Sequence, residues 1–540
     1  MKRCTIVAFV ALVGCGLIRE RPEQVPPSAP SPSKATVVTL DGEWPMVDIK
    51  IMVKAGSTAD PVGKEGLASL VARAVIDGGF GEPAAPMTKE RLAAIVQPWG
   101  EGAMPVAHVA SDTTTFHFTV PKEVLSEYLE RVLRPLMTRP LFAPEELERL
   151  KSEMVAAIPI VRYEDLETLG LAAIDEYVFE GTRYEHQPFG TEESIPRLTR
   201  DDAVGFYHTY YQPGNIILGI SVEHVAWQVR QVVESLGQTE APAPPAREPA
   251  PFEGRHAIVI EEPNAPAASV HLAFPLAVDR SHPDFWPLWV ANTWLGTHRD
   301  SFGRLYQAIR EERGYNYGDY SYIEHWDGRT GSLFQIFNQP RRKQYFSIWV
   351  RPVQHEYACH LLKAVTFELE RLIRDGLTAE QVAAAKNKAK VLYLNLGETV
   401  ERLLAARMDS AFYNMSPGFL DGYLERIEAV TAAEVNAALK KHLQVENVKY
   451  LVVTDSKHAK DLAAQLQSGG PAYGKGLKEY QLETVTLPDG TSAWQVPDSK
   501  VEMLRLDALW ANYPLRIASV RLAPVTAMFR TGKHIAPALP

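Results

Sequence analysis

The strongest constraint on the fold is an internal repeat that divides the chain into two similar halves. Each half closes with a short apolar run typical of a buried strand, residues 216–222 in the first and residues 448–453 in the second. A period of about 210 residues is too long for a solenoid repeat, so the pattern indicates a duplicated α+β domain with sheets covered by helices on one side. Both closing runs follow a helix start in which a Thr precedes an acidic residue by three positions: Thr199 with Asp202, and Thr431 with Glu434.

The segments between these landmarks alternate between strand-like and helix-like patterns. A period of two predicts strands, and apolar residues at helical spacing predict helices. In the first half, we predict strands over 47–54 and 113–120 and helices over 64–77, 144–157 and 166–179. In the second half, we predict strands over 256–260, 268–274, 332–338 and 345–351 and helices over 284–295, 301–313 and 359–374.

Proline marks the boundary between the halves. Residues 239–254 contain five Pro and little apolar bulk, which predicts a linker. The last residues lie outside the repeat, although Tyr480–Thr486 and residues 515–529 each have the pattern of a further strand. The expected organisation is an N-terminal domain over 37–238, a C-terminal domain over 255–470 and an extension of unassigned role over 471–540.

Composition narrows the class of protein. Apolar residues make up 46% of the 540-residue chain and charged residues 23%, which is the ordinary mix of a folded globular protein. The net charge of −10 gives no electrostatic reason to expect nucleic-acid binding. With only three Cys, the chain has no disulfide framework, and a hydrophobic core must hold the fold together.

The first residues have the pattern of an export signal. Lys2 and Arg3 precede an apolar run over residues 5–14, which is shorter than the ~20 residues that a membrane-spanning helix needs. The run ends at Cys15, and Leu12-Val13-Gly14-Cys15 is similar to a bacterial lipobox. We therefore predict a signal peptide over 1–14, lipidation of Cys15 and a Pro/Ser tether over 15–36. The expected location is the bacterial cell envelope, on a membrane facing the periplasm; a plain signal peptide with an incidental Cys is the alternative.

Several segments, in order, resemble the pitrilysin/insulinase family of zinc peptidases over residues 40–456. They are residues 53–57 with 66–68, 112–116, 146–153, 186–190, 210–215 and 303–317, of which the last is the most specific. The resemblance implies a two-half clamshell of insulinase-like domains, each a mainly antiparallel sheet covered by helices. In this family, an H-x-x-E-H motif on a helix supplies two zinc ligands and the general base, and a later Glu supplies the third ligand.

This chain departs from the family at those positions. Ser69 and Arg73 stand where the two His belong, and Ala72 stands where the base belongs. Glu153 alone remains at the third-ligand position, where we expect a helix-surface or Arg-paired side chain. A hydroxyl and a guanidinium do not replace two imidazoles, so we expect no metal cofactor in this chain. No two of its 15 His are spaced four residues apart, so the sequence indicates no second zinc motif.

The second half keeps a pair that the resemblance implies is functional. Arg310 and Tyr317 match an Arg and a Tyr that grip the substrate backbone and stabilise the oxyanion in family members. A chain with this pair but no zinc motif resembles the non-zinc subunit of two-chain bacterial peptidases, which implies a zinc-bearing paralogue as partner, zinc in that partner and unfolded peptides as substrates. Two other hypotheses stay open: a non-proteolytic scaffold or peptide-binding lipoprotein, and a peptidase active through an unrecognised site.

Overall fold

The computed structural model describes residues 34–163, 165–237, 252–326, 337–470, 483–495 and 498–530. The predicted signal peptide, Cys15, nearly all of the tether, most of the 239–254 linker and most of the 332–338 strand lie outside these ranges. In the described ranges, no helix combines the length and apolar character needed to cross a bilayer.

The first half contains a mainly antiparallel sheet with the strand order β1-β5-β2-β4-β3, in which only β1 and β5 run parallel. Its strands are β1 (Thr36–Thr39), β2 (Met46–Val53), β3 (Val106–Val109), β4 (Thr114–Pro121) and β5 (Ile216–Ile220). The helices of this half are α1 (Leu67–Asp77), α2 (Lys89–Val96), α3 (Leu125–Tyr128), α4 (Arg134–Thr138), α5 (Pro144–Tyr163), α6 (Leu166–Val178), α7 (Arg200–Tyr210) and α8 (Ala226–Glu234).

The second half repeats this sheet and adds a strand. The order is β13-β6-β10-β7-β9-β8, in which β6, β10, β7, β9 and β8 correspond to β1, β5, β2, β4 and β3. The strands are β6 (Arg255–Glu261), β7 (Ala268–Leu276), β8 (Asp319–Tyr322), β9 (Gln344–Val353), β10 (Val448–Thr454) and β13 (Ile517–Pro524). The helices are α9 (Phe285–Gly296), α10 (Ala358–Asp375), α11 (Ala379–Leu396), α12 (Val400–Phe412), α13 (Tyr423–Ala429), α14 (Ala432–His442), α15 (Ala459–Ser468) and α16 (Asp498–Asn512). The predicted duplicated α+β clamshell is therefore confirmed.

Local sequence signals account for the matching helix starts. At the start of α7, the Thr199 hydroxyl accepts from the Asp202 N–H, and the Asp202 carboxylate accepts from the Thr199 N–H. The same reciprocal cap links Thr431 and Glu434 at the start of α14. One predicted helix needs correction, because the part of 301–313 from Tyr306 to Glu311, η9, is a π-helix.

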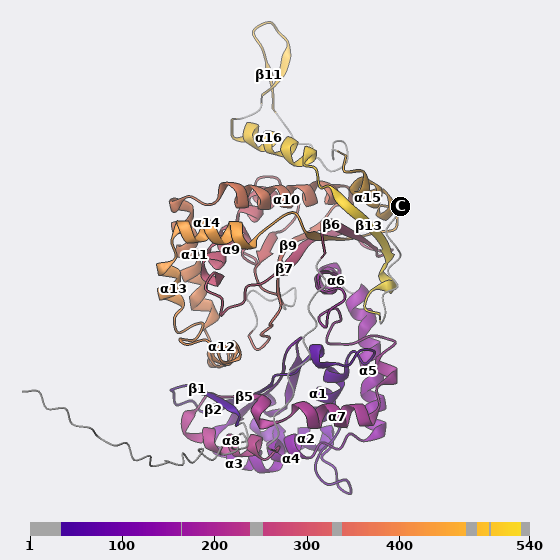
Figure 1. The fold of residues 1–540 in the computed structure, drawn as a ribbon, viewed down its shortest axis with the longest axis vertical. Helices are drawn as coiled ribbons and strands as arrows, with labels where there is room; N and C mark the ends of the chain where they lie inside the picture. Colours follow the sequence, from indigo (N-terminus) through magenta and orange to yellow (C-terminus); the bar gives the residue numbers. More distant parts are fainter. Residues whose placement is uncertain are drawn as a thin grey trace, which may run out of the picture.

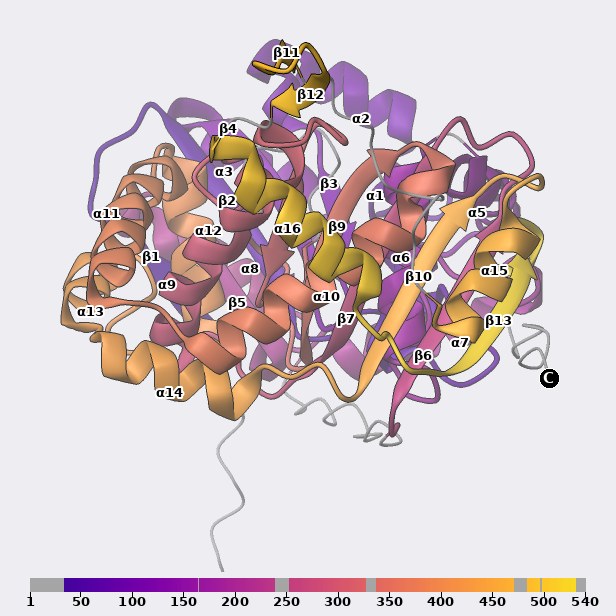
Figure 2. The ribbon, with the colours of Figure 1, turned by 90° about the horizontal axis from the view of Figure 1, so that it is seen from above.

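The extension beyond residue 470 contributes to the second half. Strand β13 runs parallel to β6 and forms the outer edge of the second sheet (Figure 2). The other predicted strand corresponds to β11 (Glu483–Thr486), which pairs with β12 (Ser492–Gln495) as a separate hairpin. Figure 1 shows this hairpin projecting beyond α16, away from the two halves.

The halves exchange one helix each. Helix α6 packs on β7, β9 and β10 of the second sheet, and α12 packs on β1, β2 and β5 of the first (Figure 1). Gly170 permits the α6 contact, since a Cβ at that position would collide with the buried His271 imidazole. Gly219 does the same for α12, because a Cβ there would collide with Met408.

Ion pairs anchor both exchanged helices. Glu167 of α6 accepts from Arg351 of β9 at 2.7 and 3.3 Å. At the matching end of α12, Glu401 accepts from Lys50 of β2 at 3.0 Å, although β2 corresponds to β7 and not to β9. The two halves are therefore locked together by packing and by charge.

Candidate functional site

A cavity of about 770 Å³ lies between the two halves. The first half supplies most of its wall from α1, β3, α5, α6 and residues 187–189, and the second half supplies His325, Trp326, Gln339 and Arg341. Ser69, Ala72 and Arg73, which occupy the lost zinc-motif positions, line this cavity. The positions that carry the metal chemistry in active relatives therefore still face the cavity between the halves.

Helix α1 presents these positions through a buried cap. The Asp60 carboxylate accepts from the N–H groups of Gly66 and Ala68, both at 2.8 Å, and lies 3.3 Å from His186 Nε2. Burial raises the pKa of Asp60, while the His186 contact acts in the opposite direction. Because Ser69 and Arg73 are four residues apart on α1, they lie on one helix face.

The polar groups at these positions do not form a zinc site. The Ser69 hydroxyl donates to the Pro188 carbonyl at 2.5 Å. Arg73 Nη1 lies 3.8 Å from Glu153 Oε2, and Glu153 also accepts from Arg149 at 2.6 Å. A guanidinium stands beside the remaining carboxylate where a cation would have to bind, so these residues do not fit zinc. The sequence predicted these substituted positions, and the structure adds that Glu153 is paired with both Arg73 and Arg149.

The other ionic side chains of the cavity wall are held by neighbours. Asp175 of α6 accepts from Arg341 at 2.7 and 3.1 Å, and both side chains are buried. Asp165 caps α6 and accepts from the N–H groups of Glu167 and Thr168, both at 3.1 Å. These two carboxylates therefore hold the wall of the cavity together.

Strand β3 gives the cavity a free sheet edge. Within the described residues it pairs only with β4, and Ala107, His108 and Val109 of this strand line the cavity. An edge strand exposes N–H and C=O groups that an extended peptide can pair with. The cavity volume also falls within the range of about 300–1,000 Å³ typical of ligand sites.

Arg310 and Tyr317 lie elsewhere. Arg310 Nη1 donates to the Tyr306 hydroxyl and to Glu311, and the guanidinium lies 4.8 Å from the Tyr306 ring centroid. Tyr317 is 76% exposed. Neither residue is part of the described cavity wall, so the structure does not bring this pair together with Ser69, Ala72 and Arg73 inside one chain.

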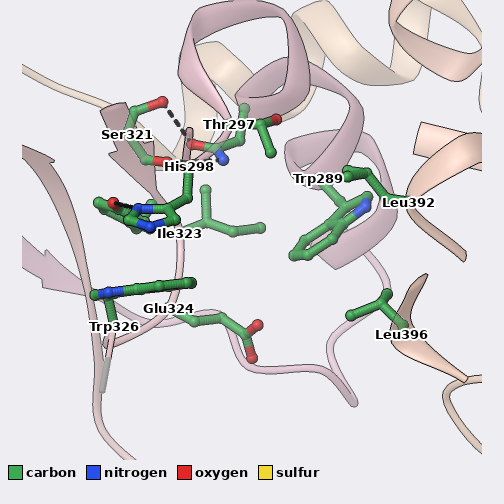
Figure 3. Close-up of a pocket in the computed structure, with 11 residues that line it drawn as sticks. Trp289, Thr297, His298, Ser321, Ile323, Glu324, Trp326, Leu392 and Leu396 are labelled. Atoms are coloured by element: carbon green, nitrogen blue, oxygen red, sulfur yellow. Dashed lines mark hydrogen bonds between the residues drawn. The ribbon is translucent and has the colours of Figure 1, made fainter. Parts of the chain in front are cut away.

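A smaller aromatic slot of about 70 Å³ adjoins the large cavity, and Trp326 lines both. The His298 ring stacks on Trp326 with centroids 4.1 Å apart, and Figure 3 shows Trp289 on the opposite side of the slot. Leu392 and Leu396 of α11 complete an apolar lining. The slot has the size and character to receive a small apolar group.

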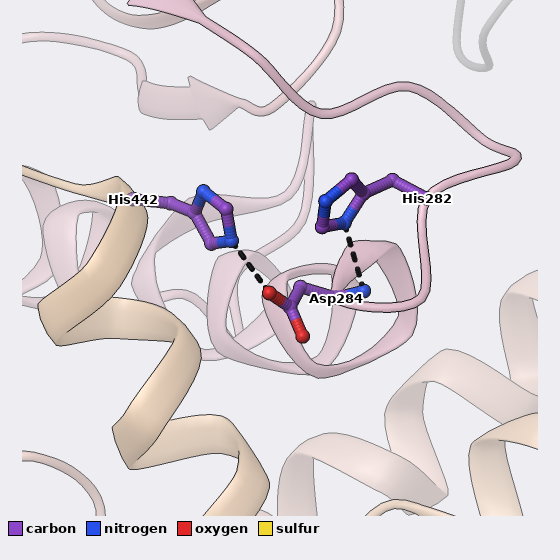
Figure 4. Close-up of side chains that lie close together, drawn as sticks. All are labelled: His282, Asp284 and His442. Carbon is purple, nitrogen blue, oxygen red and sulfur yellow. Dashed lines mark hydrogen bonds and ion pairs between the residues drawn. The ribbon is translucent and has the colours of Figure 1, made fainter.

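Folding also creates two His/Asp clusters that the spacing of His along the sequence does not reveal, because their members come from separate elements. Figure 4 shows one, His282, Asp284 and His442. His442 Nε2 and Lys441 Nζ both lie 2.7 Å from Asp284 Oδ2, and they lower the Asp284 pKa to about 2. The groups that would bind a metal are thus engaged in an ion-pair network between α9 and α14. In the other cluster, His458 Nδ1 lies 2.7 Å from Asp455 and the ring stacks in parallel on His355.

Comparisons with known proteins show which proteins this chain resembles. Residues 197–389 match the peptidase M16 inactive domain. The non-peptidase homolog YmxG of Helicobacter pylori is 21% identical over 357 residues, which cover 65% of this chain and 78% of that protein. Cytochrome b-c1 complex subunit 1 of Caenorhabditis elegans is 23% identical over 425 residues, covering 75% of this chain and 83% of that protein. The crystal structure of a peptidase M16 inactive domain from Pseudomonas fluorescens has the same fold, with a TM-score of 0.67, 22% identity and coverage of 78% and 96%.

The fold and the altered zinc-motif positions together resemble a metallopeptidase homologue that has lost its zinc motif. The chain is similar to inactive homologues of the pitrilysin/insulinase family, M16. The resemblance seen in the sequence is thereby confirmed.

Proposed function

We propose that this protein is the non-catalytic subunit of a two-chain envelope peptidase, in which a zinc-bearing paralogue carries out the hydrolysis. One observation carries the proposal: the positions of the lost zinc motif face a cavity of about 770 Å³ but carry a hydroxyl, a methyl group and a guanidinium. This chain would hold an unfolded peptide without cutting it.

The cavity wall supports peptide binding. The outer edge of β3, which no other described strand covers, can pair with an extended backbone, and the adjoining aromatic slot can receive one apolar side chain. Backbone pairing is independent of sequence, so we expect several unstructured peptides to bind.

Exposure supports a role for the Arg/Tyr pair in the partner's chemistry. Tyr317 is 76% exposed and is therefore accessible to a second chain, and it does not line the described cavity of its own chain. In the proposed complex, Tyr317 and Arg310 reach the substrate at the partner's zinc. Breaking the Arg310 contacts with Tyr306 and Glu311 frees its donors for that task.

The decisive experiment compares the purified chain, the zinc-bearing paralogue and their mixture on unstructured peptides. We expect no cleavage by this chain alone, cleavage by the mixture, and a sharp loss with Arg310→Ala or Tyr317→Phe. Arg131→Ala, which alters an exposed pair with Glu127 on the helical segment after β4, is the matched control and should keep full activity. Chelator-sensitive cleavage by the lone chain would refute the proposal.

A structural role is the second candidate, and the exchange of α6 and α12 favours it. This locked arrangement suits a rigid building block, and one relative is a subunit of the cytochrome b-c1 complex. A stable complex with a paralogue that cleaves no better than the paralogue alone would support this role over the first.

A further inference from the structure

Arg73 has hydrogen-bonding capacity that the described protein does not use. Its guanidinium donates no hydrogen bond to any described residue, and the side chain is 40% exposed where it lines the cavity. Nη1 itself is buried and has only the 3.8 Å ion pair with Glu153. An arginine presents five N–H donors in a planar fork that matches a carboxylate.

Glu153 does not satisfy the Arg73 donors, because it makes a closer contact with the Arg149 guanidinium. Arg149 donates to Glu153 Oε1 at 2.6 Å and also contacts Glu146 at 2.8 and 2.9 Å. The four side chains form a row in which Glu153 is shared and Arg73 is the terminal cation. That terminal position is the one that opens onto the cavity.

The other charged side chains of the cavity wall already have partners and are less available to a ligand. Asp175 is held by Arg341, and Asp165 is held by the start of α6. His108 and His325 also have partners of their own. Among the described lining residues, Arg73 is therefore the ionic group best able to bind an incoming anion.

We propose that Arg73 anchors a carboxylate of a peptide held in the cavity, at the position where active relatives hold zinc. The inference rests on the proposed peptide-binding function and names its ligand class: peptides with a free C-terminal carboxylate, or with an Asp or Glu side chain at the same place. The loss of the zinc motif then replaces a hydrolytic centre with an anion-binding one.

The surroundings of Arg73 suit such a ligand. Helix α1 packs against β3, and Arg73 lines the same cavity as residues 107–109 of this strand, whose outer edge no other described strand covers. Ile160 and Phe189 add apolar lining to the same cavity. A carboxylate bound to a guanidinium gains from charge-assisted hydrogen bonds.

The test measures binding of one fluorescent, unstructured peptide in three forms by anisotropy: the free acid, the C-terminal amide, and the amide with an Asp at the penultimate position. The free acid should bind about tenfold more tightly than the plain amide, since hydrogen bonds to charged groups contribute most. Equal binding of the Asp-containing amide and the free acid would show that side-chain carboxylates are accepted too.

Variants locate the effect. Arg73→Gln should bind all three forms with the affinity of the plain amide, Arg73→Lys should keep part of the preference, and Arg131→Gln should behave as wild type. Circular dichroism and thermal melting establish that each variant is folded. If wild type binds acid and amide equally, the carboxylate anchor is wrong while peptide binding stands. If wild type binds none of the peptides, the proposed peptide-binding function fails as well.

Discussion

Arg341 of the second half donates two hydrogen bonds to Asp175 of α6, at 2.7 and 3.1 Å, across the boundary between the halves. Both side chains are almost fully buried, and the guanidinium also stacks on the rings of Phe179 and Tyr184 at 4.7 and 4.8 Å. This pair holds the cavity wall in place and anchors α6 on the sheet of the second half.

Removing one member of this pair should destabilise the whole molecule. Arg341→Ala leaves the Asp175 carboxylate buried without its partner, so we expect a loss of about 3–5 kcal/mol in the free energy of unfolding. Urea unfolding measures this loss. Arg131→Ala, which breaks the exposed pair with Glu127, should cost less than about 1 kcal/mol. The double variant Arg341→Met/Asp175→Leu should recover much of the stability, and equal effects of Arg341→Ala and Arg131→Ala would contradict this account.

Stability should depend on pH through Asp409 of α12. Burial raises the pKa of Asp409 to about 7, although Arg280 and the hydrogen bonds from Asn338 oppose the rise and Glu324 adds to it. The folded state therefore binds a proton that the unfolded state releases near pH 4, so this group's contribution to stability falls as pH rises from about 4 to 7.

Asp409→Asn removes that titration. The difference in unfolding free energy between wild type and Asp409→Asn should shift against wild type by up to about 4 kcal/mol between pH 4 and pH 8. Asp421→Asn, at an exposed position, is the control and should show no such shift. A pH-independent difference for Asp409→Asn would mean that the carboxyl stays in one protonation state.

Much of this architecture follows from local sequence signals. The capping pairs at Thr199 and Thr431 fixed two helix starts, and the alternation over 47–54 located β2. The partners of α6 and α12 could not be predicted in this way, because periodicity shows that a helix has an apolar face but not which sheet covers it. For the same reason, spacing along the chain did not indicate that His282 and His442 meet. At the cavity, the lost zinc motif was readable from Ser69, Ala72 and Arg73, whereas the unused fork of Arg73 required the three-dimensional surroundings.

Zinc binding should be recoverable by restoring the motif. Ser69→His/Ala72→Glu/Arg73→His places two imidazoles one helical turn apart beside Glu153, so we expect about one zinc per chain after dialysis, measured by inductively coupled plasma mass spectrometry. Adding Glu153→Gln should weaken that binding. Stoichiometric zinc in the wild-type chain would contradict the interpretation of the site.

The lipid anchor proposed at Cys15 can be tested by fractionation. Cys15→Ser should move the protein from the membrane fraction to the soluble fraction, because the thiol that would carry the lipid is gone. Cys359→Ser, at a buried position in α10, is the matched control and should stay with the membrane. Retention of Cys15→Ser in the membrane fraction would favour the plain signal peptide instead.

Because each half lends a helix to the other, neither half carries everything needed to cover its own sheet. Expressed separately, each half would expose an apolar surface and aggregate. Solubility should return only when the two halves are refolded together. The same exchange of helices opposes a large opening of the two halves. A peptide would therefore have to enter the cavity from its open side.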